Sequence, residues 1–403
     1  MSASEPALSE VSPFFAALAL LVAALSLAML RRWVAVPAVP RRNGTIDGLR
    51  GYLALGVVLH HSAIWYFYAQ GEKWQLPPSA FYTHLGQSSV ALFFMITGFL
   101  FYGKVLDAGD QGLDWSRLAV SRVLRLVPLY VCAIGSMLLV VLAMGSFELH
   151  DSLFTLAKGV VHWLLFTLTY APDLNGLTGT GRILAGVYWS LPYEWYFYGC
   201  LPLLAGLAGR LPPWWALALS AVVAFQFARF QPESYHLAAF AGGIAAAYTA
   251  RWAVWQAVAE SAKSSVFALG LLLGLVLGFD HAHGLVQVVM LALVFALVAA
   301  GCSLWGLLLH PSSRLLGELT YGLYLFHGIA LYIVFGTGLL PATTSPLGHW
   351  IRVLALLPVL IGVCWLLHWA IERPAMGQVD RMTEWLLRRG ESVKPVFNGS
   401  RTE

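Results

Sequence analysis

An arginine and a histidine spaced eleven residues apart are the first pair in this sequence suited to chemistry. Arg50 and His61 lie in a mostly apolar stretch that begins near Asp47. At 100° per residue, eleven residues make three turns plus about 20°, so a helix places both side chains on one face, roughly 16 Å apart. His60 points about 100° away from His61. A neutral imidazole inside a protein can take a proton from a hydroxyl, so His61 is the candidate base.

A second basic pattern lies directly before the apolar stretch 126–145. Arg122 and Arg125 are three residues apart and share a helix face. Their guanidinium groups offer fixed forks of donors that suit phosphate recognition. Anchoring beside anionic lipid headgroups explains the same spacing, and spacing alone slightly favours it.

A carboxylate lies among aromatic residues in the stretch 188–198. Pro192 fits a first helical turn, so Glu194 lies near the helix N-terminus, where the helix dipole favours a negative charge. That role and one in which Glu194 orients a histidine or a sugar hydroxyl are equally compatible with the pattern. Trp189 and Tyr193 are most simply part of an interfacial aromatic belt.

A polar stripe occurs near the C-terminal end of the apolar region. Tyr321, Tyr324 and His327 recur every three residues, which places them towards the interior of a helical bundle. For each of them individually, hydrogen bonding between helices is a sufficient explanation.

The helices that must position these residues are membrane helices. Of 403 residues, 59% are hydrophobic and 11% charged, against about 25% charged in soluble domains. The formal net charge of +4 is too small to indicate a nucleic-acid partner, and the four cysteines show no metal-ligand spacing. The composition predicts an all-α, polytopic transmembrane bundle.

Apolar segments of about 20 residues give the expected spans. We expect about eleven spans, a core of ten plus one extra N-terminal helix, and an interfacial or re-entrant helix over 153–171. The spans are 13–30, 49–68, 85–103, 126–145, 188–209, 213–230, 237–252, 265–279, 285–305, 318–338 and 350–370.

Loop charge predicts the orientation. An external N-terminus and a cytoplasmic C-terminus place most of the 24 lysines and arginines inside. The first apolar run follows acidic residues and lacks a convincing cleavage site, so we interpret it as a retained helix. The expected divisions are 1–42 (extra helix and basic loop), 43–375 (transmembrane domain) and 376–403 (cytoplasmic tail).

Several motifs occur together and in order. They are Arg50 and His61 as R-x10-H, ALFFMITGFL at 91–100, Arg122 and Arg125 as RxxR, WSLPYE at 189–194, LTYGLYLFH at 319–327 and ERP at 372–374. Over about residues 43–375 the chain resembles the acyltransferase family 3 membrane proteins.

The resemblance implies an O-acyltransferase that moves an acetyl or other short acyl group from acyl-CoA to a sugar or an antibiotic. In that family's scheme His61 acts on the acceptor hydroxyl, Glu194 belongs to the same catalytic site, and Arg50 with the Arg122/Arg125 pair places acyl-CoA. The remaining site residues, expected to bind substrate, are Trp189, Tyr193 and His327. The expected surroundings are the lipid bilayer of a bacterial inner membrane, with a carbohydrate acceptor and no metal.

A transporter or flippase of a glycan or lipid-linked sugar is the alternative. Such proteins commonly show paired half-repeats and broken helices, and neither is clear here. The identity of the acceptor and the length of the acyl chain stay open at this point.

Overall fold

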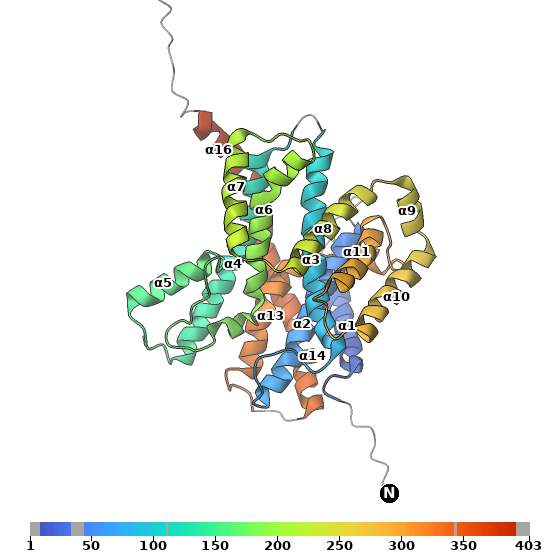
Figure 1. Cartoon of the computed structure of the whole chain (residues 1–403). Coiled ribbons are helices and arrows are strands. Elements are labelled where there is room, and N and C mark those ends of the chain that lie inside the picture. The colour runs from blue at the N-terminus through green and yellow to red at the C-terminus, as the bar shows by residue number, and fades with distance from the viewer. Residues whose placement is uncertain (1–8, 34–43, 110–111, 342–344, 392–403) are drawn as a thin grey trace, which may run out of the picture.

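The protein is a bundle of helices. The computed structural model describes residues 9–33, 44–109, 112–341 and 345–391, and in these ranges the chain forms no β-strand (Figure 1). The α-helices are α1 (Pro13–Leu30), α2 (Gly44–Ala69), α3 (Ala80–Asp107), α4 (Trp115–Met144), α5 (Leu153–Leu164), α6 (Ser190–Leu207), α7 (Trp214–Arg229), α8 (Ser234–Thr249), α9 (Ala253–Ala259), α10 (Ala262–Gly278), α11 (Leu285–Ala299), α12 (Pro311–Glu318), α13 (Thr320–Phe335), α14 (Pro346–Leu367), α15 (Arg373–Met376) and α16 (Val379–Glu391). Short helical turns η3 (Thr180–Leu184), η4 (Val187–Trp189), η5 (Leu307–Leu309) and η6 (His368–Glu372) connect them.

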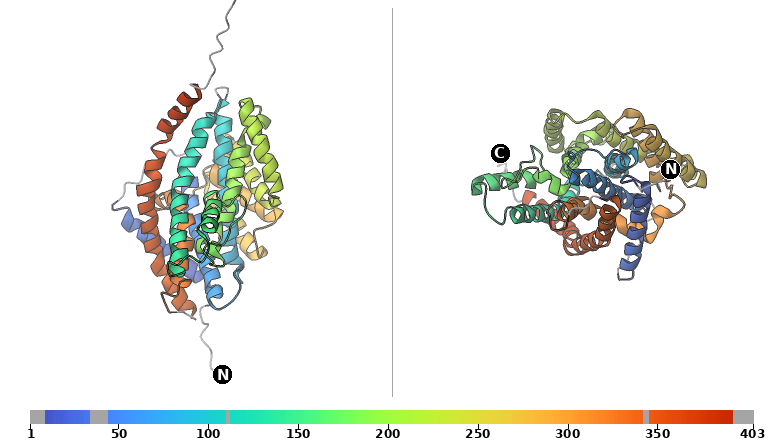
Figure 2. Two further views of the ribbon diagram at one scale, coloured as in Figure 1. Left: turned by 90° about the vertical axis from the view of Figure 1, so that its left-hand side faces the viewer. Right: turned by 90° about the horizontal axis from the view of Figure 1, so that it is seen from below.

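Each of the eleven predicted segments coincides with a helix, so the all-α prediction is confirmed. The largest boundary difference is α4, which begins at Trp115 rather than near 126. Hydropathy detects only the apolar part of this helix, whereas the helix itself starts where Asp114 accepts a hydrogen bond of 2.8 Å from the backbone N–H of Arg117. The segment 153–171 contains α5, which projects from the side of the bundle (Figures 1 and 2).

The described part of the chain contains several helices able to span a bilayer. Four are long and apolar enough, namely α1, α3, α4 and the run from α14 through α16, which together make this a multi-pass membrane protein. The total is six if each of two bent pairs is one span: α9 with α10, bent by 75°, and α12 with α13, bent by 66°. The count of eleven therefore stays a prediction.

Helices α2 and α3 form the centre of the bundle and pack closely on their neighbours. A Cβ at Gly243 of α8 would overlap the backbone carbonyl of Met95 in α3, and a Cβ at Gly317 of α12 would overlap that of Asp47 in α2. Glycine is required at both positions because the backbones approach closely. These close contacts fix the positions of α2 and α3, which carry candidate site residues, relative to α12 and α8.

The extra helix α1 is an integral part of the packing. Phe15 stacks on Trp350 of α14 with ring centroids 5.2 Å apart, and the Trp350 indole N–H donates to the Glu10 carbonyl at 2.9 Å. The predicted basic loop after α1 falls largely outside the described residues, as does the tail from 392 onward.

The bundle has two distinct ends. The start of α4, the end of α3 and α16 lie at one end, and the end of α2 and the start of α14 lie at the other (Figure 1). Amphipathic α16 continues from α14 and exposes Trp385 and Leu386, with Asp380 paired to Arg117 at 2.7 Å. A helix of this kind suits a membrane–water interface.

Candidate active site

Two cavities lie along α3, one after the other. The arginine cavity, of about 430 Å³, is lined from Val90 to Lys104 of this helix, and the histidine cavity, of about 470 Å³, from Gly86 to Ala91. Val90 and Tyr324 line both. Gly86 and Lys104 are separated by about 27 Å of helical rise, close to the ~30 Å thickness of a hydrocarbon core. Together the cavities extend along most of the depth of a membrane.

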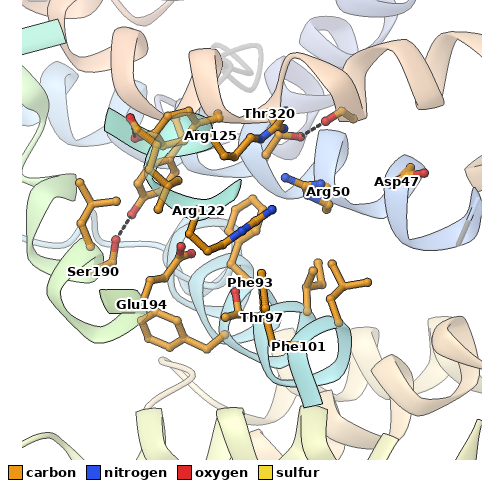
Figure 3. A pocket seen from close by; sticks show the side chains of 18 of the residues that line it. Asp47, Arg50, Phe93, Thr97, Phe101, Arg122, Arg125, Ser190, Glu194 and Thr320 are labelled. Carbon is orange, nitrogen blue, oxygen red and sulfur yellow. Dashed lines mark hydrogen bonds between the residues drawn. The ribbon is translucent and has the colours of Figure 1, made fainter. Parts of the chain in front are cut away.

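Arg50 and Arg122 approach each other inside the arginine cavity from α2 and α4 (Figure 3). Arg50 makes no hydrogen bond or ion pair with any other residue that the structure describes. Arg122 donates to the Ser121 hydroxyl at 3.1 Å and lies 4.7 Å above the Phe101 ring, while its buried Nε has no hydrogen-bond partner. Neither guanidinium forms an ion pair with a carboxylate among the described residues, although Glu194 lines the same cavity, so both retain donors that an anion could use.

Arg125 also lines this cavity, but its guanidinium is engaged. It forms an ion pair with Glu372, whose side chain is only 1% exposed, and the second oxygen of Glu372 lies 2.9 Å from His368 Nδ1. The RxxR and ERP motifs therefore meet in one contact between α4 and η6. Arg125 therefore has a structural role, and its predicted role in binding the donor stays a prediction.

Glu194 lies in the arginine cavity and accepts a hydrogen bond of 3.0 Å from the Tyr198 hydroxyl. His61 lines the histidine cavity instead, so the two residues expected to form one catalytic site lie in different cavities. The helix explains this separation, because Glu194 lies one turn into α6 and lines the cavity beside Asp47 and Arg50, at the lower-numbered end of α2. Glu194 is thus a neighbour of the arginines rather than of His61.

His61 is oriented by a second histidine. Its Nδ1 lies 3.0 Å from the Val57 carbonyl and 3.2 Å from Nε2 of His327, and His327 Nδ1 lies 2.9 Å from the Leu323 carbonyl. Because a carbonyl can only accept, each neutral ring carries its proton on Nδ1. His61 therefore donates from Nδ1 to both partners and keeps its Nε2 lone pair free.

The family of the chain follows from comparison with known proteins. The model of the acyltransferase domain of acyltransferase family 3 matches residues 43–369. The chain belongs to acyltransferase family 3. Acyltransferase MdmB of Streptomyces mycarofaciens is 24% identical over 84% of this chain and 93% of its own length. Exopolysaccharide production protein ExoZ of Rhizobium meliloti (strain 1021) is 27% identical over 76% of this chain and 95% of its own. No solved structure matches.

The two cavities of this family 3 acyltransferase are divided by a small polar cluster, the partition, formed by Val187, Ser190 and Tyr324. The Ser190 hydroxyl lies 2.6 Å from that of Tyr324, and the Val187 carbonyl is within 3.1 Å and 3.2 Å of the two. Both hydroxyl protons are used within the cluster, one to the carbonyl and one between the hydroxyls. Ser190 borders the arginine cavity (Figure 3), and Val187 borders the histidine cavity.

The remaining predicted substrate residues also border the histidine cavity or its histidine pair. Trp189 and Tyr193 line the cavity, and His327 reaches it only through His61, being fully buried. Sequence reasoning missed four lining residues: Glu233, Tyr235, His236 and His283. Their signal is an unusual density of titratable and aromatic residues around the start of α8 and in the short connection before α11.

Among the residues that the structure describes, no group of histidine, cysteine and carboxylate side chains has the arrangement of a metal site. The described features of the candidate site are a cavity lined by arginines, a histidine pair and a partition between the two cavities.

Proposed function

We propose that the protein is an acyl-CoA-dependent O-acyltransferase that transfers an acyl group, with acetyl as the expected one, to a hydroxyl of a sugar or glycan. One observation supports this proposal: a cavity into which Arg50 and Arg122 converge and a cavity with an oriented histidine pair share Val90 and Tyr324 as lining residues. A donor held by its phosphates in the first cavity can extend a slender arm to the second.

The arginine cavity suits the donor in charge and in shape. Arg50 and Arg122 supply two forks for phosphate oxygens, which would replace the water that these cations have lost. Beyond them the wall is formed by apolar side chains such as Phe93, Ile96 and Leu100. An uncharged pantetheine arm can lie along this wall and bring its thioester towards Tyr324.

The chemistry assigned to His61 is proton transfer. Its free Nε2 takes the proton of the acceptor hydroxyl while that oxygen forms a bond to the thioester carbonyl carbon. The carbon–sulfur bond then breaks, and the leaving thiolate takes the proton from the imidazolium. The products are an O-acyl ester and a free thiol. A route through an acyl-imidazole uses the same nitrogen.

His327 is a positioning residue in this scheme. It accepts from His61 Nδ1–H, fixes the tautomer and stabilises the imidazolium that forms during transfer.

The proposed orientation in the membrane rests on the distribution of lysine and arginine among the loops. With the N-terminus outside and the C-terminus in the cytoplasm of a bacterium, the arginine cavity lies on the side where acyl-CoA is made. The similarity to an acyltransferase and to an exopolysaccharide production protein supports acyl transfer to a glycan.

The test uses membranes from cells that lack the native gene and express the full chain. They receive [1-14C]acetyl-CoA, and ester-linked label on glycans or glycolipids is measured. We expect label with the wild type and none above background with His61→Ala, because a positioned base contributes about 10²–10⁴-fold.

The control variant is His162→Ala, on exposed α5 and outside both cavities. It is expected to label like the wild type. Equal labelling by purified, folded His61→Ala protein would falsify the assignment of His61. Bound acetyl-CoA with no labelled hydroxyl in any acceptor fraction would exclude the enzyme activity and favour transport.

A further inference from the structure

Resting on the proposed function, we infer that the histidine cavity contains a pyranose subsite for a neutral or amino-substituted sugar, built around His236 and closed to acidic sugars. The acceptor class is thus determined by Glu233, Tyr235, His236 and His283, which lie outside the family motifs, together with Trp189 and Tyr193 of the WSLPYE motif.

His236 is a buried polar side chain without a hydrogen-bond partner. It lines the histidine cavity near the start of α8, is 6% exposed, and its Nδ1 makes no hydrogen bond with any described residue. An imidazole removed from water without a partner is costly, since a buried unsatisfied group loses about 1–3 kcal/mol. A sugar hydroxyl in the cavity can supply the missing hydrogen bond.

Aromatic rings hold this imidazole in place. Trp189 stacks against it with centroids 4.9 Å apart and planes at 28°, and the edges of Tyr193 and Phe94 approach it at 4.8 Å and 5.3 Å. The His236 ring therefore has little freedom to turn, and its nitrogens keep a fixed direction.

A flat platform lies beside the imidazole. Trp189 is 39% exposed although it borders the cavity, so part of its ring remains uncovered. Tyr235 stacks on His283 with centroids 4.3 Å apart and planes at 16°. The C–H face of a pyranose is apolar and slightly positive, and it is attracted to the negative face of an aromatic ring. A small-molecule site typically combines apolar or aromatic walls with a few placed polar groups, and the aromatic platform and His236 provide this combination.

The charge of the wall determines which sugars fit. Glu233 is the single charged side chain that lines the cavity among the described residues, and no lysine or arginine does. Burial lowers the pKa of the His283 imidazole, so this ring is neutral at pH 7. A uronate or a phosphorylated sugar would lose hydration without gaining a cation, which is unfavourable. A protonated amino sugar would gain Glu233 as a partner.

The first experiment identifies the acetylated residue. Glycans and glycolipids from cells lacking the gene are incubated with purified full-length protein and deuterated acetyl-CoA, and tandem mass spectrometry assigns the heavy acetyl group. We expect it on a hexose, a deoxyhexose or an amino sugar. A heavy acetyl on a uronate, on a phosphorylated sugar or on a hydroxyl outside any sugar overturns the inference.

The second experiment tests His236 itself. His236→Ala should raise the acceptor KM about tenfold, as for one lost hydrogen bond, and leave the acetyl-CoA Kd and the melting temperature unchanged. His236→Gln, which keeps a polar group, should recover part of this loss. The matched control is His281→Ala in the connection before α11, an exposed residue that does not line the cavity. An unchanged acceptor KM in His236→Ala refutes the subsite.

Glu233→Lys tests the charge rule. This change should raise the rate with an acidic glycan relative to an amino-sugar glycan by at least tenfold, and the same ratio in both proteins contradicts the rule. Absence of transfer by the wild type with intact acetyl-CoA binding sinks the proposed function. Transfer with unchanged specificity in the variants sinks the subsite alone.

Discussion

The ion pair between Arg125 and Glu372 offers a direct test of whether the RxxR motif holds the fold or the donor. Glu372 is 1% exposed and Arg125 20%, so the carboxylate depends on the guanidinium far more than the reverse. Replacing Arg125 by methionine leaves a buried carboxylate with only the His368 imidazole beside it. Breaking a buried pair in this way costs about 3–5 kcal/mol.

The partner substitution should cost less. Glu372→Met leaves the Arg125 cation at the edge of a cavity that water can enter, which we expect to cost about 1–2 kcal/mol. In the double variant both charges are replaced by apolar side chains of similar length, and its stability should return close to that of the wild type. Because the double variant returns close to wild-type stability, the expected coupling energy between the two sites is about 4–7 kcal/mol, the sum of the two single losses.

The assay is thermal unfolding of purified protein in detergent, with acetyl-CoA affinity measured on the same samples. Arg125→Met should melt roughly 5–10 °C below the wild type, and the double variant within a few degrees of it. Acetyl-CoA affinity should change less than in Arg50→Gln. A wild-type melting temperature combined with a tenfold loss of acetyl-CoA affinity in Arg125→Met would refute the structural role.

Three further results are expected. Arg50→Gln and Arg122→Gln should each weaken acetyl-CoA binding, measured by titration calorimetry, about tenfold without lowering the melting temperature, because neither guanidinium forms an ion pair with a carboxylate in the described part of the chain; a lower melting temperature would contradict this. His327→Ala should lower kcat about 10–100-fold with acetyl-CoA affinity unchanged, and a loss of affinity alone would argue against a positioning role. Gly243→Ala should destabilise the fold by about 1–3 kcal/mol in thermal melts. Gly270→Ala, where the added methyl meets open space, should stabilise the fold by up to about 1 kcal/mol. Equal effects of the two substitutions would refute the packing argument.

The helices were predictable because the bilayer imposes a strong and local rule. A window of apolar residues predicts where a helix lies, and each predicted segment contains one. The number of crossings was harder to predict. Helices such as α7 and α11, with 16 and 15 residues, are shorter than the usual span. The 66° bend between α12 and α13 depends on the backbone and leaves the hydropathy pattern unchanged.

The site was predictable along one helix and not between helices. The spacing of Arg50 and His61 indicated a shared face, and the structure places them in two adjoining cavities. The contact of His61 with His327 joins residues 266 positions apart, which no local pattern can reveal. The same holds for the pairing of Arg125 with Glu372, since a motif records which residues occur but not which of them meet.

The partition has an electrical consequence. Where cavities enter a membrane protein from both ends, water and ions carry the potential of each side inward, and most of the transmembrane voltage falls across the thin part between them. In the proposed orientation, that thin part is the partition of Val187, Ser190 and Tyr324. Moving one charge across 100 mV costs or releases about 2.3 kcal/mol. Under the proposed function the donor is a neutral thioester, so the reacting group would reach His61 through the steepest part of the field without coupling to the voltage. The phosphates, which would couple to it strongly, would stay behind with Arg50 and Arg122.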